Sequence, residues 1–392
     1  MKILHRPQKS IKLVAALAVT ATLVASCTGV EPTPGSTPTI GTTTARPTSP
    51  FDPTQAPPDP TGPLIAYRAD DEIGIVDGTK VVATAPGTFE PSNDLIVTDD
   101  GRFVFARTTD NKVATIDVAS GEATTREVPV SPVLGTIGDS TIVWLEQPNR
   151  LMQLDLADPD SQPVLYQTVD LPPSGGTGKP RLVVARGGTA VIARVEGPPS
   201  PSGGPDTLYA VRGPGAPTRL GQAEANSPVT VARLSPDGAE LVYALYRSTG
   251  SDCGTAAVVM SDADGAQQTF DVAGPGAGSA SRVPKLWWPP SGPPRLSLAT
   301  WRCDRPETYS PLVWQLTGQT PGVPDTTESI EEVTPPTSAL QSAEVAPGQR
   351  ALVLPETGAY SEPMGTLVLE ESDRRISIKD GVDAIAVIRP SP

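Results

Sequence analysis

Histidine is almost missing from this chain of 392 residues, since its one histidine, His5, lies in an amino-terminal segment that we expect to be removed. The mature chain would then contain none. Without histidine, the Ser-His-Asp and Cys-His arrangements of nucleophilic catalysis are excluded, and so is any histidine-ligated metal. Glycosidic cleavage by two carboxylates needs no histidine and stays open. We expect no cofactor and no metal site.

Aromatic residues and positive charge are also scarce. Aromatics make up 4% of the chain, so the core must rely on Val, Leu, Ile and Ala, and the irregular spacing of the five tryptophans indicates core packing. The net charge is −14, and it becomes −18 once the first 26 residues, with their four cations and no acid, are set aside. A chain this acidic would repel phosphates, which argues against a nucleic-acid partner.

The longest apolar run lies close to the amino terminus. It extends from Leu13 to Ala25 after a basic start, which is too short for a comfortable membrane span and is typical of a signal-peptide core. The run ends in Val24-Ala25-Ser26-Cys27, which resembles the lipobox of bacterial lipoproteins. That resemblance implies cleavage before Cys27, lipidation of Cys27 and a lipid anchor at the extracytoplasmic face of the cell membrane. The alternative is an ordinary signal peptide, with Cys27 incidental.

The composition divides the chain into three parts. Residues 1–26 are the expected lipoprotein signal peptide, and residues 27–62 are rich in Thr and Pro. That second part lacks the apolar density to pack, so we expect a disordered stalk beneath a folded domain at 63–392. Arginines (22) greatly outnumber lysines (eight), and Ala, Gly, Pro and Val are abundant, which favours a GC-rich, actinobacterial source.

Short hairpins recur along the third part. The segment Ala232–Leu245, ARLSPDGAELVYAL, has two strand-like apolar runs around the turn Ser235-Pro236-Asp237-Gly238. Gly supplies positive φ in such a turn, and Pro and Asp favour its entry. Looser copies surround Asp99-Asp100-Gly101, Gly138-Asp139, Gly187-Gly188 and Pro347-Gly348. Each hairpin is followed by further strands, and the four-strand unit recurs about every 40–60 residues, in the range of a propeller blade.

The count of units predicts seven blades. Six inner strands are expected near Leu95, Val133, Arg181, Val229, Val283 and Ser342. One piece remains at each end of the domain: Pro63–Ala85 offers three strands, and Asp383–Pro390 offers one. Together these pieces make the seventh blade, so the fold is predicted to be all-β and closed by a carboxy-terminal strand, which removes an open sheet edge.

The Ser-Pro-Asp-Gly turn before an alternating strand resembles the repeat of TolB-type and WD40-like β-propellers. The resemblance extends over roughly Pro63–Pro392 and is clearest at Leu234–Leu245 and Thr98–Arg107. It implies a propeller fold and a scaffold role. The Trp-Asp and Gly-His signatures of WD40 repeats are missing, and the stalk stands where TolB has an amino-terminal domain. TolB's own partnership is therefore not implied.

Two cysteines remain once Cys27 is lipidated. An exported domain meets an oxidising environment, so Cys253 and Cys303 are expected to form a disulfide. Both lie at the end of, or just after, the second strand of neighbouring blades, which places them at the same end of the propeller. The alternative is two free thiols.

The long loops at that end are the candidate partner surface. Loops on a rigid scaffold commonly carry function, and aromatic and guanidinium groups are typical interface anchors. The candidate residues in these loops are Tyr246, Arg247, Trp301, Arg302, Arg305, Tyr309 and Tyr360. The alternative is that these loops are only variable connections.

The sequence therefore predicts a monomeric, lipid-anchored propeller that binds a protein or a cell-wall polymer and catalyses nothing. Two alternatives stay open. The first is an extracytoplasmic enzyme that acts on glycans through carboxylates, and the second is a structural scaffold of an envelope assembly.

Overall fold

The computed structural model describes residues 64–90, 94–128, 133–176, 178–198, 203–224, 227–248, 253–272, 278–289, 291–304, 311–317, 329–333, 336–355, 364–372 and 374–389. All of them lie in the second of the two compact units of the chain, Met1–Pro53 and Thr54–Pro392. The predicted signal peptide, Cys27 and the stalk lie outside the described residues. Within the described ranges every regular element is a β-strand, and no helix there could cross a membrane.

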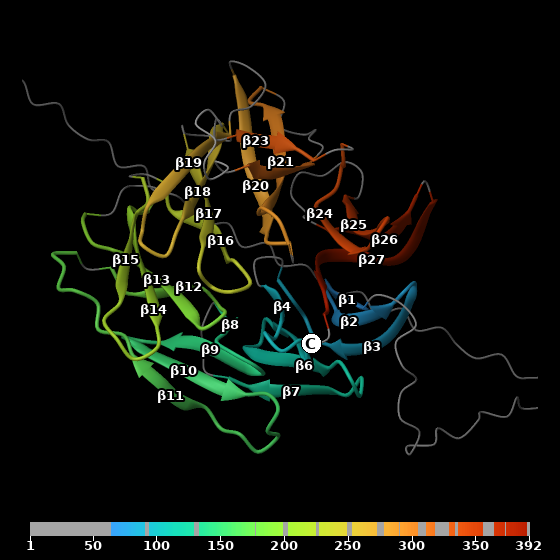
Figure 1. Cartoon of the computed structure of the whole chain (residues 1–392), viewed down its shortest axis with the longest axis horizontal. Helices are drawn as coiled ribbons and strands as arrows, with labels where there is room; N and C mark the ends of the chain where they lie inside the picture. Colours follow the sequence, from blue (N-terminus) through green and yellow to red (C-terminus); the bar gives the residue numbers. More distant parts are fainter. Residues whose placement is uncertain are drawn as a thin grey trace, which may run out of the picture. The chain divides into compact units, whose positions relative to one another are not determined.

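The strands form antiparallel sheets arranged around a common centre (Figure 1). Five sheets have four strands each, and the sixth has seven. The larger sheet consists of two blades that share β27 (Arg374–Val387), because this strand pairs first with β26 and then with β1. The structure is therefore the seven-bladed all-β propeller that the repeat predicts.

In each blade the chain runs from the inner strand to the outer strand. Blade 1 comprises the end of β27, then β1 (Leu64–Ala69), β2 (Glu72–Asp77) and β3 (Lys80–Pro86). Blade 2 is β4 (Leu95–Val97), β5 (Phe103–Arg107), β6 (Lys112–Asp117) and β7 (Ala123–Glu127). Blade 3 is β8 (Gly135–Thr136), β9 (Thr141–Glu146), β10 (Arg150–Asp155) and β11 (Val164–Thr168). Blade 4 is β12 (Arg181–Arg186), β13 (Thr189–Val195), β14 (Asp206–Arg212) and β15 (Thr218–Gln222).

The remaining blades complete the circle. Blade 5 is β16 (Val229–Leu234), β17 (Leu241–Ser248), β18 (Gly254–Ser261) and β19 (Gln267–Val272). Blade 6 is β20 (Ser279–Trp287), β21 (Arg295–Arg302), β22 (Leu312–Thr317) and β23 (Ser329–Glu332). Blade 7 is β24 (Gln341–Ala346), β25 (Gln349–Pro355), β26 (Gly365–Glu371) and the start of β27. The inner strands thus lie at, or within a few residues of, their predicted positions.

The hydrophobic core lies between the blades. Successive side chains of a strand point to opposite faces of a blade, and each face packs against a neighbouring blade. In β1, for example, Ile65 and Tyr67 pack with blade 7, whereas Ala66 between them packs with blade 2. The two middle strands are therefore buried on both faces and read as nearly continuous apolar runs, while outer strands such as β7 are largely exposed.

The turn from the first to the second strand has the same construction in blades 2 and 5. The Ser235 hydroxyl donates to Asp237 at 2.6 Å, and the Gly238 amide donates to the Ser235 carbonyl at 2.9 Å. In blade 2, Thr98 donates to Asp100 at 2.6 Å in the same way. Gly238 is required twice over, because its φ is +70° and a Cβ there would lie 2.6 Å from the carbonyl oxygen of Arg186.

Closure of the ring depends on the last strand. Ala66 and Tyr67 of β1 pair with Ala386 and Ile385 of β27, so the carboxy-terminal segment supplies the inner strand of the first blade. This pairing is the predicted seventh-blade closure. It satisfies the edge of β1, which would otherwise present unpaired backbone groups.

Deletion of residues 383–392 removes the closing half of β27. We expect the truncated protein to aggregate or to lose its cooperative unfolding transition, because blade 1 loses its inner strand and exposes an edge. Size-exclusion chromatography and a thermal melt measure both effects. Deletion of residues 390–392 alone removes none of the described strand pairs and is the matched control. A monomeric 383–392 deletion that melts like this control would refute the closure.

Candidate functional site

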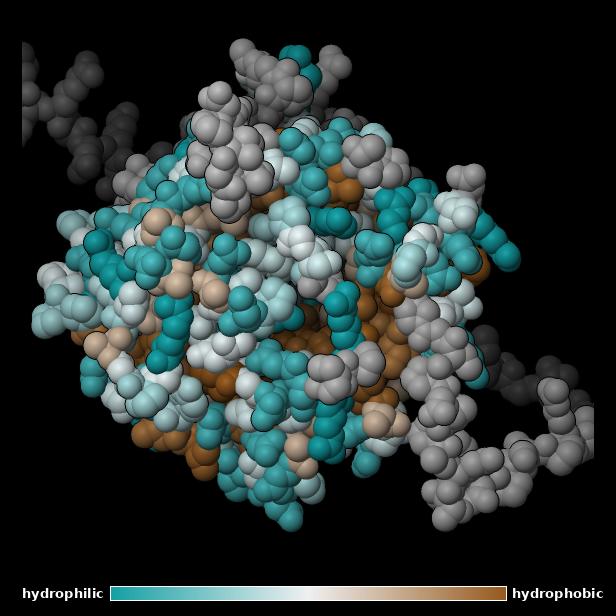
Figure 2. Space-filling view, in the orientation of Figure 1, coloured by the Kyte–Doolittle hydropathy of each residue, from teal (hydrophilic) through white to brown (hydrophobic). Residues whose placement is uncertain are grey.

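A cavity of about 630 Å³ lies at the centre of the propeller, which we call the central pocket. Its walls contain residues from all seven inner strands, including the closing part of β27, and from several first-to-second strand turns. Figure 2 shows the hollow in the middle of the molecule, with hydrophobic residues at its floor. The volume lies within the range of about 300–1,000 Å³ that is usual for small-ligand sites.

The central pocket carries positive charge in an acidic protein. Five cationic side chains line it, against three carboxylates, which gives a formal net charge of +2 for the lining. The cations are Arg186, Arg233, Lys285, Arg295 and Arg389, and the carboxylates are Asp94, Asp99 and Glu344. Because the whole chain has a net charge of −14, this site differs from its surroundings in the sign of its charge.

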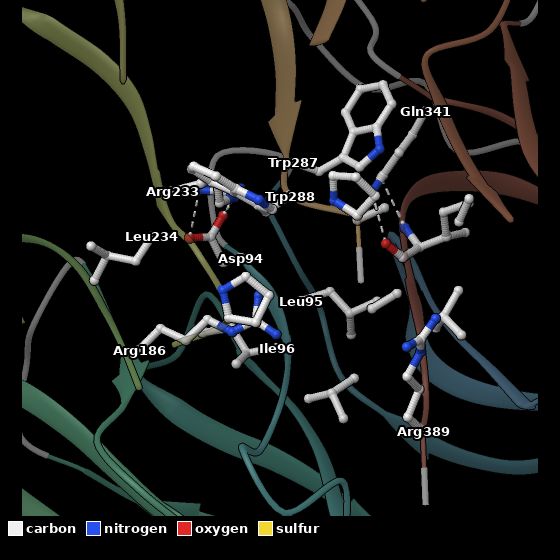
Figure 3. Close-up of a pocket in the computed structure, with 18 of the residues that line it drawn as sticks. Asp94, Leu95, Ile96, Arg186, Arg233, Leu234, Trp287, Trp288, Gln341 and Arg389 are labelled. Atoms are coloured by element: carbon white, nitrogen blue, oxygen red, sulfur yellow. Dashed lines mark hydrogen bonds and ion pairs between the residues drawn. The ribbon is translucent and has the colours of Figure 1, made fainter. Parts of the chain in front are cut away.

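Two of the three lining carboxylates are engaged within the protein. Asp94 accepts two hydrogen bonds from Arg233, at 2.6 Å from Nη2 and 3.2 Å from Nη1 (Figure 3). Asp99 accepts the hydroxyl of Thr136 at 2.9 Å and the amide of Gly187 at 3.2 Å. These bonds join different blades across the pocket wall. They hold both side chains in fixed positions and leave Glu344, exposed on β24, as the third acid.

Arg186 is the last residue of β12, and its side chain lies partly buried in the pocket wall. No hydrogen bond or ion pair joins its guanidinium to any residue within the described ranges. Burial is the main influence on the pKa of Arg186 and lowers it, while Asp99 opposes the shift and Arg233 adds to it. A partly buried cation without a hydrogen-bonding partner is unfavourable in a folded protein, which makes this position unusual.

Lys285 belongs to a buried charge cluster beside the pocket. Asp383 of the closing strand accepts Arg68 Nε at 2.9 Å and Lys285 Nζ at 3.4 Å. The side chains of Arg68 and Asp383 are only 1% and 2% exposed. Burial disfavours the charged form of Asp383, yet the bonds from Arg68 and Lys285 outweigh it and hold the pKa of Asp383 below its ordinary value. Burial lowers the pKa of Lys285.

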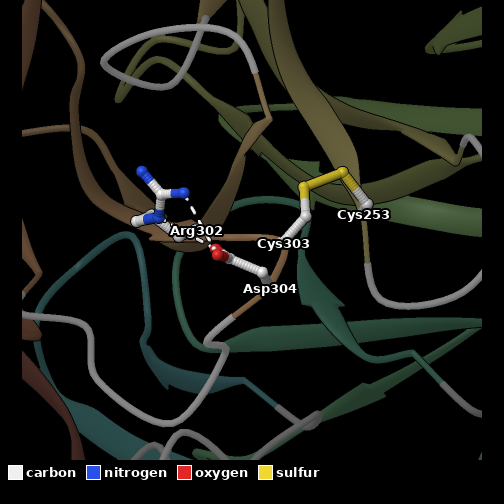
Figure 4. Close-up of a disulfide and its surroundings, with 4 residues drawn as sticks. All are labelled: Cys253, Arg302, Cys303 and Asp304. Atoms are coloured by element: carbon white, nitrogen blue, oxygen red, sulfur yellow. Dashed lines mark hydrogen bonds and ion pairs between the residues drawn. A yellow bond between two sulfur atoms is a disulfide. The ribbon is translucent and has the colours of Figure 1, made fainter.

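The cysteine prediction is confirmed, since the structure contains the Cys253–Cys303 disulfide with Cα atoms 5.2 Å apart (Figure 4). Cys253 precedes β18 and Cys303 follows β21, so the bond joins the second-to-third strand loops of blades 5 and 6. We call this end of the propeller the loop face. The Cys303 amide also donates to the Gly278 carbonyl at 2.9 Å.

The predicted partner residues have different environments. The prediction that Trp301 binds a partner is wrong. This residue is 5% exposed and packs in the interior, so it cannot be a surface anchor. Arg247 is already held by Glu224, at 2.7 and 2.6 Å, and by Asp271 at 2.7 Å. These bonds, mainly the one with Glu224, raise the pKa of Arg247.

Two other predicted partner residues lie close to the disulfide. Arg302 is exposed and pairs with Asp304 at 2.8 Å (Figure 4). The ring of Tyr246 packs over Gly254, where an added Cβ would come within 2.6 Å of it. Arg305, Tyr309 and Tyr360 lie outside the described residues. The use of any of these side chains by a partner stays a prediction.

The sequence interpretation missed the central pocket. It placed binding on the loop face, whereas many pocket residues lie in or next to first-to-second strand turns, at the opposite ends of the strands. The sequence does contain a pattern that could have indicated the pocket, namely an arginine close to a first-to-second strand turn. Arg186 immediately precedes the turn Gly187-Gly188, and Arg233 lies two residues before Ser235. Trp288, which the same interpretation placed in the core, packs against a core cluster and also lines the pocket.

No protein-family model and no curated protein matches the sequence. Among solved structures, it is similar to a protein from Bacteroides uniformis provisionally assigned as a 6-phosphogluconolactonase (13% identity, TM-score 0.45, covering 83% of this chain and 99% of that one). It is also similar to the β-propeller domain of Cps50 (Swd1) from Myceliophteria thermophila (13% identity, TM-score 0.44, covering 78% and 94%). A third is a functionally unknown protein from Desulfotomaculum acetoxidans (12% identity, TM-score 0.47, covering 84% and 100%). The fold assignment rests on the sheets themselves, and these likenesses assign no function to this chain.

The buried Asp383 cluster generates a stability prediction. Asp383→Asn leaves Arg68 and Lys285 charged beside a neutral amide, so we expect a loss of about 3–5 kcal/mol in the free energy of unfolding at neutral pH. Because the folded-state pKa of Asp383 is lowered, its contribution is fully present above the unfolded value of about 4 and is lost as the pH falls below it. Urea unfolding of wild type and variant at neutral and acidic pH measures this difference.

The control for Asp383 is Asp304→Asn, which removes an exposed ion-pair partner whose side chain is 58% exposed. Because an exposed ion pair contributes little to stability, this variant should unfold close to wild type. If Asp383→Asn were no more destabilising than this control, or if its effect did not shrink in acid, the closing ion pair would not have the role assigned to it.

Proposed function

We propose that this chain is a non-catalytic binding protein of the bacterial cell envelope. In this proposal it is exported, cleaved before Cys27, anchored by lipid at Cys27 and carried on the stalk, and its propeller holds a protein or an envelope polymer on the loop face. The proposed localisation rests on the amino-terminal sequence pattern, and the proposed binding role rests on the propeller. Its source is a bacterium with a GC-rich genome, of the actinobacterial kind.

The observation that carries the proposal is the disulfide between two loops of adjacent blades. Cys253 and Cys303 are 50 residues apart in sequence, and the chain-entropy model assigns such a crosslink roughly 4 kcal/mol. The strands of both blades are already paired and packed, so the bond mainly restrains the loops. A surface fixed before binding loses less conformational entropy when a partner docks.

The enzyme alternative has less support from the central pocket. Glycosidic cleavage needs one carboxylic acid that donates a proton and a second carboxylate nearby. Asp94 is instead held by both terminal nitrogens of Arg233, and Asp99 by Thr136 and Gly187. Each bond commits the carboxylate to a structural contact. The scaffold alternative predicts the same anchor but no defined contact on the loop face.

The anchor is tested with Cys27→Ser. We expect this variant to leave the membrane fraction or to accumulate with its signal peptide uncleaved, because lipidation requires the thiol. Fractionation of cells and intact-mass measurement report both outcomes. Cys253→Ser is the matched control, since it also removes one cysteine but not the lipidation site. Unchanged fractionation and unchanged mass in Cys27→Ser would refute the lipid anchor.

The loop face is tested by photo-crosslinking in intact cells. A photo-reactive amino acid replaces Arg302, next to the disulfide, or Arg102, in the first-to-second strand turn at the opposite end of the propeller. We expect a discrete adduct from position 302 and none from position 102. The adduct should weaken in Cys253→Ser/Cys303→Ser, whose loops are no longer tied. Equal adducts from both positions, or an adduct that is unaffected by loss of the disulfide, would contradict the proposal.

A further inference from the structure

The central pocket has a charge arrangement that the loop-face proposal does not use. Arg233 is paired with Asp94, and Lys285 shares the carboxylate of Asp383 with Arg68. Arg186, Arg295 and Arg389 are not paired in this way. No hydrogen bond or ion pair links any of these guanidinium groups to a residue in the described part of the chain, and the proposal below concerns Arg186 and Arg389.

These two arginines approach the pocket from different blades. Arg186 ends β12 of blade 4, and Arg389 follows the closing strand β27 of blade 1. Figure 3 shows them on opposite sides of the cavity, with Leu95 and Ile96 between them. Trp288 lies on the same wall as the Arg233–Asp94 pair. The pocket thus combines arginines that have no bonded partner among the described residues with an apolar and aromatic surface.

A second set of unsatisfied donors belongs to the same lining. The indole nitrogen of Trp287 and Nε of Arg295 are buried, and neither has a hydrogen-bond partner within the described residues. Buried donors are normally satisfied by protein, water or ligand. Guanidinium and indole N–H groups only donate, and both atoms are almost fully covered by protein, so they are not counted as contacts for a ligand in the pocket.

We propose that the central pocket binds a small organic anion that has a carboxylate or phosphate group and an apolar body. The anionic group accepts hydrogen bonds from Arg186 or Arg389, and the apolar body packs against Leu95, Ile96 and Trp288. A guanidinium matches the geometry of a carboxylate or a phosphate, and such charge-assisted bonds are stronger than neutral ones. This site is separate from the loop face.

The lining explains why a neutral or cationic ligand is a poorer match. A cation would be repelled by the lining arginines, and among the three lining carboxylates only the exposed Glu344 has no hydrogen bond from the described residues. A neutral ligand would leave Arg186, which is partly buried, without a partner after its water was removed, which is unfavourable. An anion can pair with Arg186 or Arg389 and keeps the Arg233–Asp94 pair in place.

The test measures three probes by titration calorimetry: 1-naphthyl phosphate, 1-naphthoate and the neutral 1-naphthol. We expect at least one anion to bind about tenfold or more tightly than the neutral probe, as expected for one charge-assisted hydrogen bond. Arg186→Gln or Arg389→Gln should lower the affinity for that anion by about 10- to 100-fold. The affinity for 1-naphthol should not change. Arg219→Gln, on the exposed outer strand β15, is the matched control and should bind like wild type.

Inorganic phosphate separates a built site from simple charge attraction. If phosphate alone binds as tightly as 1-naphthyl phosphate, the apolar wall takes no part and the proposal fails in this form. It also fails if 1-naphthol binds as well as the anions, if no probe binds at millimolar concentration, or if both arginine variants keep wild-type affinity.

A thermal melt shows whether the arginine variants lose binding through unfolding. Arg186 makes no internal bond within the described residues, so Arg186→Gln should melt at the wild-type temperature or slightly above it. The anionic probe should raise the melting temperature of wild type and not that of the variant, because only the native pocket binds it. An Arg186→Gln protein that melts well below wild type would show a structural role and overturn the assignment.

Discussion

The shared strand β27 is the constraint on which the rest of the structure depends. Its first part completes blade 7, and its last part supplies the inner strand of blade 1. Every blade buries both faces against its neighbours, so an open ring would expose two apolar faces as well as a sheet edge. The backbone pairing is reinforced by the buried Arg68–Asp383 pair, whose carboxylate also reaches Lys285 of blade 6.

Closure also creates the central pocket. Seven inner strands, brought together by the ring, place side chains from distant parts of the sequence around one cavity. Arg233 and Asp94 are 139 residues apart, and yet they form a two-point ion pair in its wall. The same ring places two ends of the molecule in different chemical settings. The loop face is fixed by a disulfide, and the central pocket carries cations that have no bonded partner among the described residues.

Local patterns determined much of the fold. The Ser-Pro-Asp-Gly turn, the alternating apolar strands and the spacing of the hairpins were enough to predict four-stranded blades and a carboxy-terminal closing strand. They succeed because turn geometry and strand periodicity depend on near neighbours in the sequence. The disulfide followed from cysteine count and strand order, since the repeat placed Cys253 and Cys303 at equivalent positions of adjacent blades.

The sequence alone determined the repeat, the closure and the cysteine pair, whereas only the tertiary structure decided which side chains are exposed, paired or left without a partner. Trp301 belongs to a loop-like sequence but is buried, and Arg247 is neutralised by two acids from other segments. Arg186 is an ordinary strand-end arginine in the sequence, and in the fold it becomes a cation of a central pocket with no bonded partner among the described residues. The physical reason is that charge pairing and burial depend on contacts between blades, which come from residues far apart in the chain, whereas turns and strands do not.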